Sequence, residues 1–202
     1  MPEVPLPPDF SWRTIDQLAR RVGGYCWWEH RLFELTGRWA SGTGNPEIRV
    51  LFSQMSARHA AFSLQWRDRL PARAGVDVTA LVVATSRADA DALTILEGQS
   101  GDLLRLGGLI EVVLPRLHSA YRAHLTQASA VSEGPVIEVL RQISAAGDRE
   151  MSQGQALLPP DQWPGQSGRP TPQGAGNVEE FCHTLERSFE AASDKSPAVW
   201  AS

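Results

Sequence analysis

Four polar residues occupy inward-facing positions in the predicted helices: Glu29, His59, Tyr121 and Glu150. Each lies in a different helix, at a position where the spacing of apolar residues predicts that a side chain faces the interior. Two carboxylates and one imidazole form an incomplete relative of the facial triad that holds iron, and manganese is an alternative ion. The same groups suit general acid–base chemistry without any cofactor, because burial raises the pKa of a carboxyl. All four are therefore candidate catalytic residues, and Glu29, His59 and Glu150 are candidate ligands of a single metal ion.

Each of these residues also has a purely structural interpretation. Glu29 can pair with an arginine such as Arg58, and His59 can be a core histidine that bonds to a neighbouring helix. Glu150 can belong to an ion pair on a helix face, and Tyr121 can be a buried tyrosine with one hydrogen-bond partner. At each of these four positions, a catalytic or metal-binding role and a purely structural role therefore remain alternatives.

Bulky side chains near these positions predict either a packed core or a pocket for a small substrate. The residues assigned to such a pocket are Trp28, Met55, Phe62 and Trp66. In the segment GYCWWEHRLFELTGRW (24–39), apolar residues recur every three or four positions and form the inward-facing seam of a helix. Glu29 falls on this seam, whereas His30 and Glu34 fall beside it. His118 and His124 are likewise expected beside the seam, on solvated or interhelical faces.

Helix signals divide the chain into elements that would position these residues. A first helix is expected from Ser11 or Thr14 to about Ala40, and a second from Asn45 as N-cap to about Leu70. The run VTALVV suggests a strand or a buried turn, and a Ser86 box starts a short helix through about Glu97. The later helices and segments are 101–128, kinked or split by a proline at 115, then 135–158, a Pro/Gly-rich linker 159–177 and a tail helix 178–192.

Connection lengths predict the architecture. Helices one and two are joined by a short loop, as are helices three and four, whereas about thirty residues separate helices two and three. One long crossover between two antiparallel hairpins is the ferritin-like arrangement. The expected fold is therefore an all-α, ferritin-like four-helix bundle over residues 11–158, with a Pro-rich lead-in (1–10), the linker and a C-terminal amphipathic helix.

Two segments, LFELTGRWASGTGNPEIRVLFSQMSARHAAFSLQWRDRLP and LPRLHSAYRAHLTQASAVSEGPVIEVLR, resemble a bacterial ferritin-like protein family. In that family a helix ending in a Gly-x-Trp turn precedes a Pro-Glu helix with a central histidine. The resemblance covers roughly residues 20–158 and implies a relative of di-iron oxidases, oxygenases and hydroxylases. It aligns Glu29 with the ligand of the first helix and His59 with the histidine of Glu-x-x-His. Ser56, Gly147 and the lack of a histidine on the fourth helix depart from that pattern, which implies a degenerate metal-ligand set.

Bulk properties exclude several classes of function. The chain has 202 residues, a net charge of −4 and a pI near 5.7, which argues against nucleic acid or anionic membranes as partners. Two distant cysteines form no disulfide framework, and neither a secretory signal nor a membrane-spanning run is recognisable. We expect a cytoplasmic protein, and a homodimer is left open.

The leading hypothesis is an enzyme that acts on a small organic substrate in the bundle core, by a metal-dependent oxidation in bacterial biosynthesis. The first alternative is a metal-free acid–base enzyme, such as an isomerase, dehydratase or cyclase, on the same fold. The second is a non-catalytic scaffold or binding protein. An enzyme should have a cavity that joins Glu29 and His59, whereas packing should fill that region in a scaffold.

Overall fold

The computed structural model describes residues 13–71, 77–158 and 178–193, and within these ranges every regular element is helical. The elements are α1 (Ile15–Gly42), α2 (Pro46–Arg67), η1 (Val78–Leu81), α3 (Arg87–Glu97), α4 (Asp102–Gly107), η2 (Gly108–Val113), α5 (Leu114–Gln127), α6 (Gly134–Leu157) and α7 (Val178–Ser193). The prediction of an all-α protein is thus confirmed for the described ranges. The predicted lead-in (1–10) and linker (159–177) lie outside them.

The first two helices begin at the capping residues that the sequence indicates. Thr14 closes a capping box with Gln17, in which each side chain accepts a hydrogen bond from the other residue's backbone N–H. The Asn45 side chain accepts from the N–H groups of Glu47 and Ile48, and Pro46 occupies the first turn of α2. These caps fix where each helix begins, and so which side chains face the middle of the molecule.

The crossover between α2 and α4 contains two short helices and no strand among its described residues. The run predicted as a strand or buried turn forms the 3₁₀ helix η1, which Asp77 caps by accepting from the N–H of Thr79. This turn packs directly on α1 at Gly23, where a Cβ would collide with the Leu81 carbonyl. Ser86 caps α3, which ends at Glu97 as the sequence predicts.

A π-helical turn interrupts the third long segment just before Pro115, where the sequence predicts a kink or a split. The chain runs as α4, then as the π-helical turn η2, and resumes as α5 with Pro115 in its first turn. Proline has no N–H to donate to the preceding turn, and a wider π turn just before it changes the hydrogen-bond register. The segment therefore stays continuous, and it still buries Leu106, Ile110, Leu117 and Tyr121.

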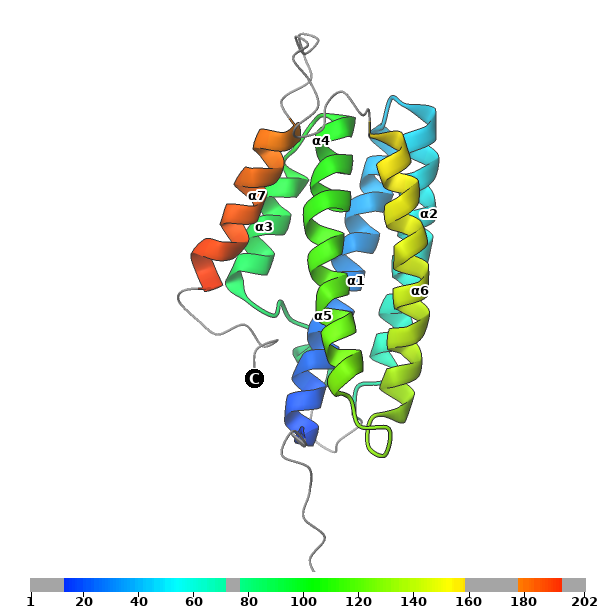
Figure 1. Cartoon of the computed structure of the whole chain (residues 1–202), viewed down its shortest axis with the longest axis vertical. Helices are drawn as coiled ribbons and strands as arrows, with labels where there is room; N and C mark the ends of the chain where they lie inside the picture. The colour runs from blue at the N-terminus through cyan, green and yellow to red at the C-terminus, as the bar shows by residue number, and fades with distance from the viewer. Residues whose placement is uncertain (1–12, 72–76, 159–177, 194–202) are drawn as a thin grey trace, which may run out of the picture.

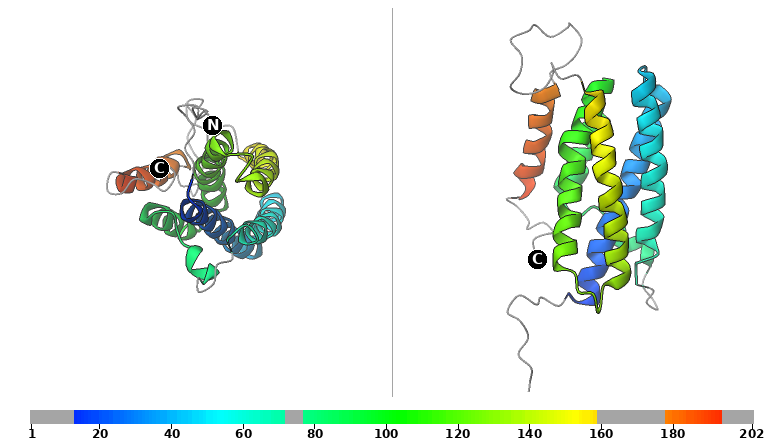
Figure 2. Two further views of the ribbon diagram at one scale, coloured as in Figure 1. Left: turned by 90° about the horizontal axis from the view of Figure 1, so that it is seen from below. Right: turned by 45° about the vertical axis from the view of Figure 1, so that its right-hand side comes forward.

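Figure 1 shows α1, α2, α6 and the α4–η2–α5 segment running side by side along the long axis. Seen from below in Figure 2, these elements surround a common centre, while α3 and α7 lie together outside that ring. The crossover carries the chain from one end of the molecule to the other, so α2 and α4–α5 run in the same direction. The amphipathic tail α7 packs on α3, α4 and η2, with Leu185 and Phe189 fully buried. None of the described helices is both long and apolar enough to cross a membrane.

Candidate functional site

The middle of the molecule holds a hydrogen-bonded chain of three side chains from three helices. One carboxylate oxygen of Glu29 (α1) lies 2.6 Å from Nδ1 of His59 (α2), and the other accepts a 2.6 Å hydrogen bond from the hydroxyl of Tyr121 (α5). All three side chains are essentially inaccessible to solvent. The structure therefore brings together three of the residues that periodicity singles out, and each oxygen of Glu29 has one protein partner.

Glu150 extends this chain to the fourth long helix. Its carboxylate lies 3.7 Å from Nε2 of His59 and 3.2 Å from the guanidinium of Arg58. Burial by itself lowers the pKa of His59, but the charges of Glu150 and Glu29 outweigh that effect and raise it. Burial raises the pKa of Glu150, against the opposing charges of His59 and Arg58. Two carboxyl groups thus face the imidazole of His59 and the guanidinium of Arg58.

His118 (α5) belongs to the same centre, although the sequence pattern leaves it beside the seam. Its ring is buried and rests on α6 at Gly147, where a Cβ would overlap the imidazole. Burial lowers the pKa of His118 to about 4, so the ring is neutral at pH 7. Gly147, which breaks the Glu-x-x-His pattern that the resemblance implies, is therefore the residue that makes room for His118.

A single metal ion on Glu29, His59 and Glu150 requires their donor atoms to converge on one point. Instead, Glu29 and His59 bind each other through Oε2 and Nδ1, and the positive charge of Arg58 lies beside Glu150. Within the described ranges, no group of three or more histidine, cysteine, aspartate or glutamate side chains is placed to hold a metal ion. In this arrangement the three residues do not fit iron or manganese.

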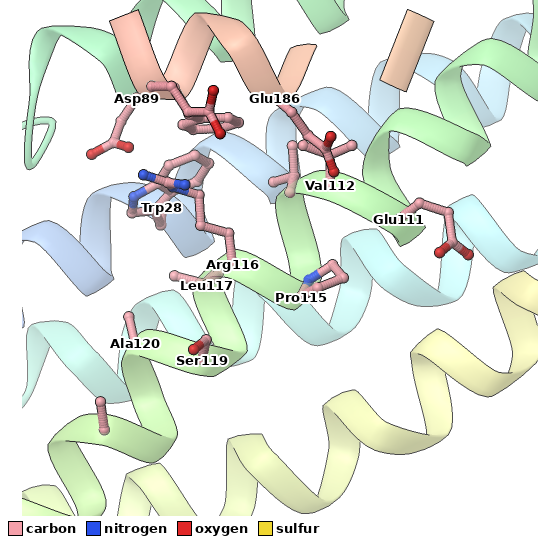
Figure 3. A pocket seen from close by; sticks show the side chains of 14 residues that line it. Trp28, Asp89, Glu111, Val112, Pro115, Arg116, Leu117, Ser119, Ala120 and Glu186 are labelled. Atoms are coloured by element: carbon pink, nitrogen blue, oxygen red, sulfur yellow. The ribbon is translucent and has the colours of Figure 1, made fainter. Parts of the chain in front are cut away.

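The residues assigned to a substrate pocket are mainly packed into the core. Met55 and Trp66 are fully buried, and neither they nor Phe62 line any of three hollows on the described surface. Trp28 lines one of these, a hollow of about 630 Å³ between α7 and α5. Figure 3 shows Trp28 in this hollow together with Arg116 and several carboxylates. None of these three hollows is lined by Glu29, His59, Tyr121 or Glu150.

A second buried polar chain, which the sequence pattern does not reveal, lies at the end of the molecule where α1 begins. Nε2 of His124 is 2.7 Å from Glu133, and its Nδ1 is 3.1 Å from the hydroxyl of Tyr25. Arg13 pairs with the other oxygen of Glu133 at 3.3 Å. Burial lowers the pKa of His124 to about 4. The available signal was that His124 lies three positions after Tyr121 on one helix face.

Three other polar residues of α1 lie near this centre in the sequence. His30 is exposed and Glu34 is half-buried, and their side chains lie 3.6 Å apart. Cys26 is buried, and burial raises the pKa of its thiol, which disfavours a nucleophilic thiolate.

In comparisons with known proteins, no family model, no curated protein and no solved structure matches the chain.

Proposed function

We propose that this chain is a metal-free, non-catalytic protein of the ferritin-like type that acts by binding a ligand or partner at its surface. The order of the long helices, with one crossover that makes α2 and α4–α5 parallel, supports the ferritin-like assignment. Inward polar residues from each of the long segments support the same assignment, since such proteins build their centre from facing helices.

The observation that carries the non-catalytic assignment is the closure of the centre. Glu29, His59, Tyr121 and Glu150 are each at most 2% exposed, and the partners of Glu29 are protein groups on both oxygens. A catalytic group must come within hydrogen-bond reach of a substrate. In the described structure these side chains meet protein groups from neighbouring helices, and we infer that the centre ties those helices together.

A metal-free acid–base enzyme is the second candidate, and one atom favours it. Nε2 of His59 is buried with no hydrogen-bond partner, while Nδ1 is held by Glu29. An imidazole that a carboxylate orients through one nitrogen can act as a general base through the other. Such an enzyme needs a path from solvent to this atom, which is the point on which the two proposals differ.

Histidine modification by diethyl pyrocarbonate, followed residue by residue with mass spectrometry, separates them. His30 and His183 have side chains that are 52% and 64% exposed and provide internal references. His118 is the best reporter of the centre, because its ring is neutral at pH 7 and resists labelling only if reagent cannot reach it. The non-catalytic proposal expects His118 and His59 to label at least about 100-fold more slowly than His30, in proportion to the unfolded fraction. Labelling of His59 or His118 at a rate near that of His30 in the folded protein would support the enzyme.

A further inference from the structure

A hollow of about 560 Å³ is lined by side chains of α1, α2 and the η1 turn, and none of its lining residues belongs to the central polar chain. Its walls are the side chains of Phe33, Ala60, Leu64, Val78 and Val82. The volume falls within the range typical of sites for small molecules, which are mostly apolar with a few fixed polar groups. Helix η1 forms one wall, so the crossover contributes directly to its shape.

Two large apolar side chains of this hollow are unusually exposed. Leu64 is 62% exposed and Phe33 is 37% exposed, and both belong to helices that bury most of their large apolar residues. Single exposed apolar residues are common, but an exposed group of them around a concavity is typical of a binding site. Covering them would gain about 25 cal/mol for each Å² removed from water.

The polar groups of the hollow give the charge of its ligand. Arg67, the last residue of α2, lines it and forms no salt bridge within the part of the chain that the structure describes. No aspartate or glutamate lines the hollow; its other polar residues are Cys26, Ser63, Thr79 and His30, and the His30 ring lies 3.6 Å from Glu34 on the same helix. An arginine beside apolar walls is complementary to a carboxylate that carries an apolar tail.

We propose that this hollow binds a small amphipathic carboxylic acid. The carboxylate pairs with the guanidinium of Arg67, and the apolar tail covers Phe33 and Leu64 between α1, α2 and η1. This inference deepens the proposed surface-binding function by naming a ligand class, and it uses none of the residues of the central chain.

Calorimetric titration with three eight-carbon probes tests the proposal: octanoate, 1-octanol and octylammonium. Octanoate is expected to bind best and with saturation, since only its head group complements Arg67. Arg67→Gln should weaken octanoate binding about tenfold to hundredfold, to the level of 1-octanol, and leave 1-octanol itself unchanged. Arg69→Gln is the matched control, because Arg69 is exposed two residues further on and does not line the hollow.

A second variant tests the location without changing any charge. Ala60→Trp places a large side chain in the hollow from an accessible position on α2, and it should abolish binding of both octanoate and 1-octanol. The proposal fails if octanoate shows no saturable binding, if Arg67→Gln and Arg69→Gln weaken it equally, or if octylammonium binds as tightly. Failure here leaves the closure of the centre intact, because closure is measured independently by the labelling of His59 and His118.

Discussion

Replacing Gly147 by alanine should be unusually harmful for such a small change. The added Cβ would fall on the buried imidazole of His118, and even the longest of its three nearest contacts, to Nε2, would be only 2.5 Å. Atoms at that separation overlap, so either the ring or helix α6 must move. His118 is 2% exposed, which leaves the ring little space to move into.

The magnitude follows from two opposing effects. Overpacking a filled core typically costs about 1–3 kcal/mol, and displacement of a whole ring belongs at the upper end of that range. Glycine to alanine within a helix gains about 1 kcal/mol from propensity. We therefore expect Gly147→Ala to lower the free energy of unfolding by about 2 kcal/mol.

Urea denaturation followed by circular dichroism at 222 nm measures this loss. Gly134→Ala, in the same helix, is the control, because nothing lies within 4 Å of its added Cβ. It should leave the stability unchanged or raise it by up to about 1 kcal/mol. In a His118→Ala background the clash is gone, so Gly147→Ala should there become neutral or stabilising, a coupling of about 2–3 kcal/mol. The reasoning is refuted if Gly147→Ala behaves like Gly134→Ala, or if its effect is the same with and without His118.

Three further predictions follow from the same geometry. Tyr121→Phe removes one of two hydrogen bonds to the buried carboxylate of Glu29, so it should lower the free energy of unfolding by about 1.5–3 kcal/mol. Urea denaturation measures this loss, and an unchanged urea midpoint would contradict the Tyr121–Glu29 hydrogen bond. The pKa of His118 is about 4 in the folded protein and about 6.5 in the unfolded chain, so its protonation favours unfolding as the pH falls from about 6.5 to 4. This residue alone should cost up to about 3 kcal/mol across that window, and His118→Ala should flatten the acid side of a stability–pH profile relative to wild type. Phe189→Ala should release the tail helix, because Phe189 is fully buried and stacks on Trp28 with 6.4 Å between the ring centroids. Limited proteolysis should then cut the variant within α7 while the other helices stay resistant. Equal resistance of α7 in the variant and the wild type would contradict this docking.

Sequence periodicity predicts much of this molecule because its long helices carry apolar residues at three-four spacing and the first two begin at recognisable caps. Thr14 and Asn45 are such caps, and the inward positions of Glu29, His59 and Tyr121 follow from a three-four spacing that continues along each helix. Pro115 locates the interruption of the third long segment for the same local reason, since it cannot donate a hydrogen bond.

What periodicity could not predict depends on contacts between helices. The burial of His118 depends on the missing side chain of Gly147 on a different helix. The chain from Tyr25 through His124 to Glu133 joins α1, α5 and the start of α6, which no local pattern connects. The strand or turn suggested for VTALVV became a 3₁₀ helix because the chain there packs against α1, a tertiary effect that overrides β-propensity.

The most direct test of the account is a crystal structure of the protein grown with Mn²⁺, with anomalous data collected near the manganese edge. The account predicts that Glu29 and His59 still bind each other at hydrogen-bond distance and that no anomalous peak lies between them and Glu150. A manganese ion ligated by these three side chains, with the Glu29–His59 bond opened, would contradict it and restore the metal-dependent enzyme.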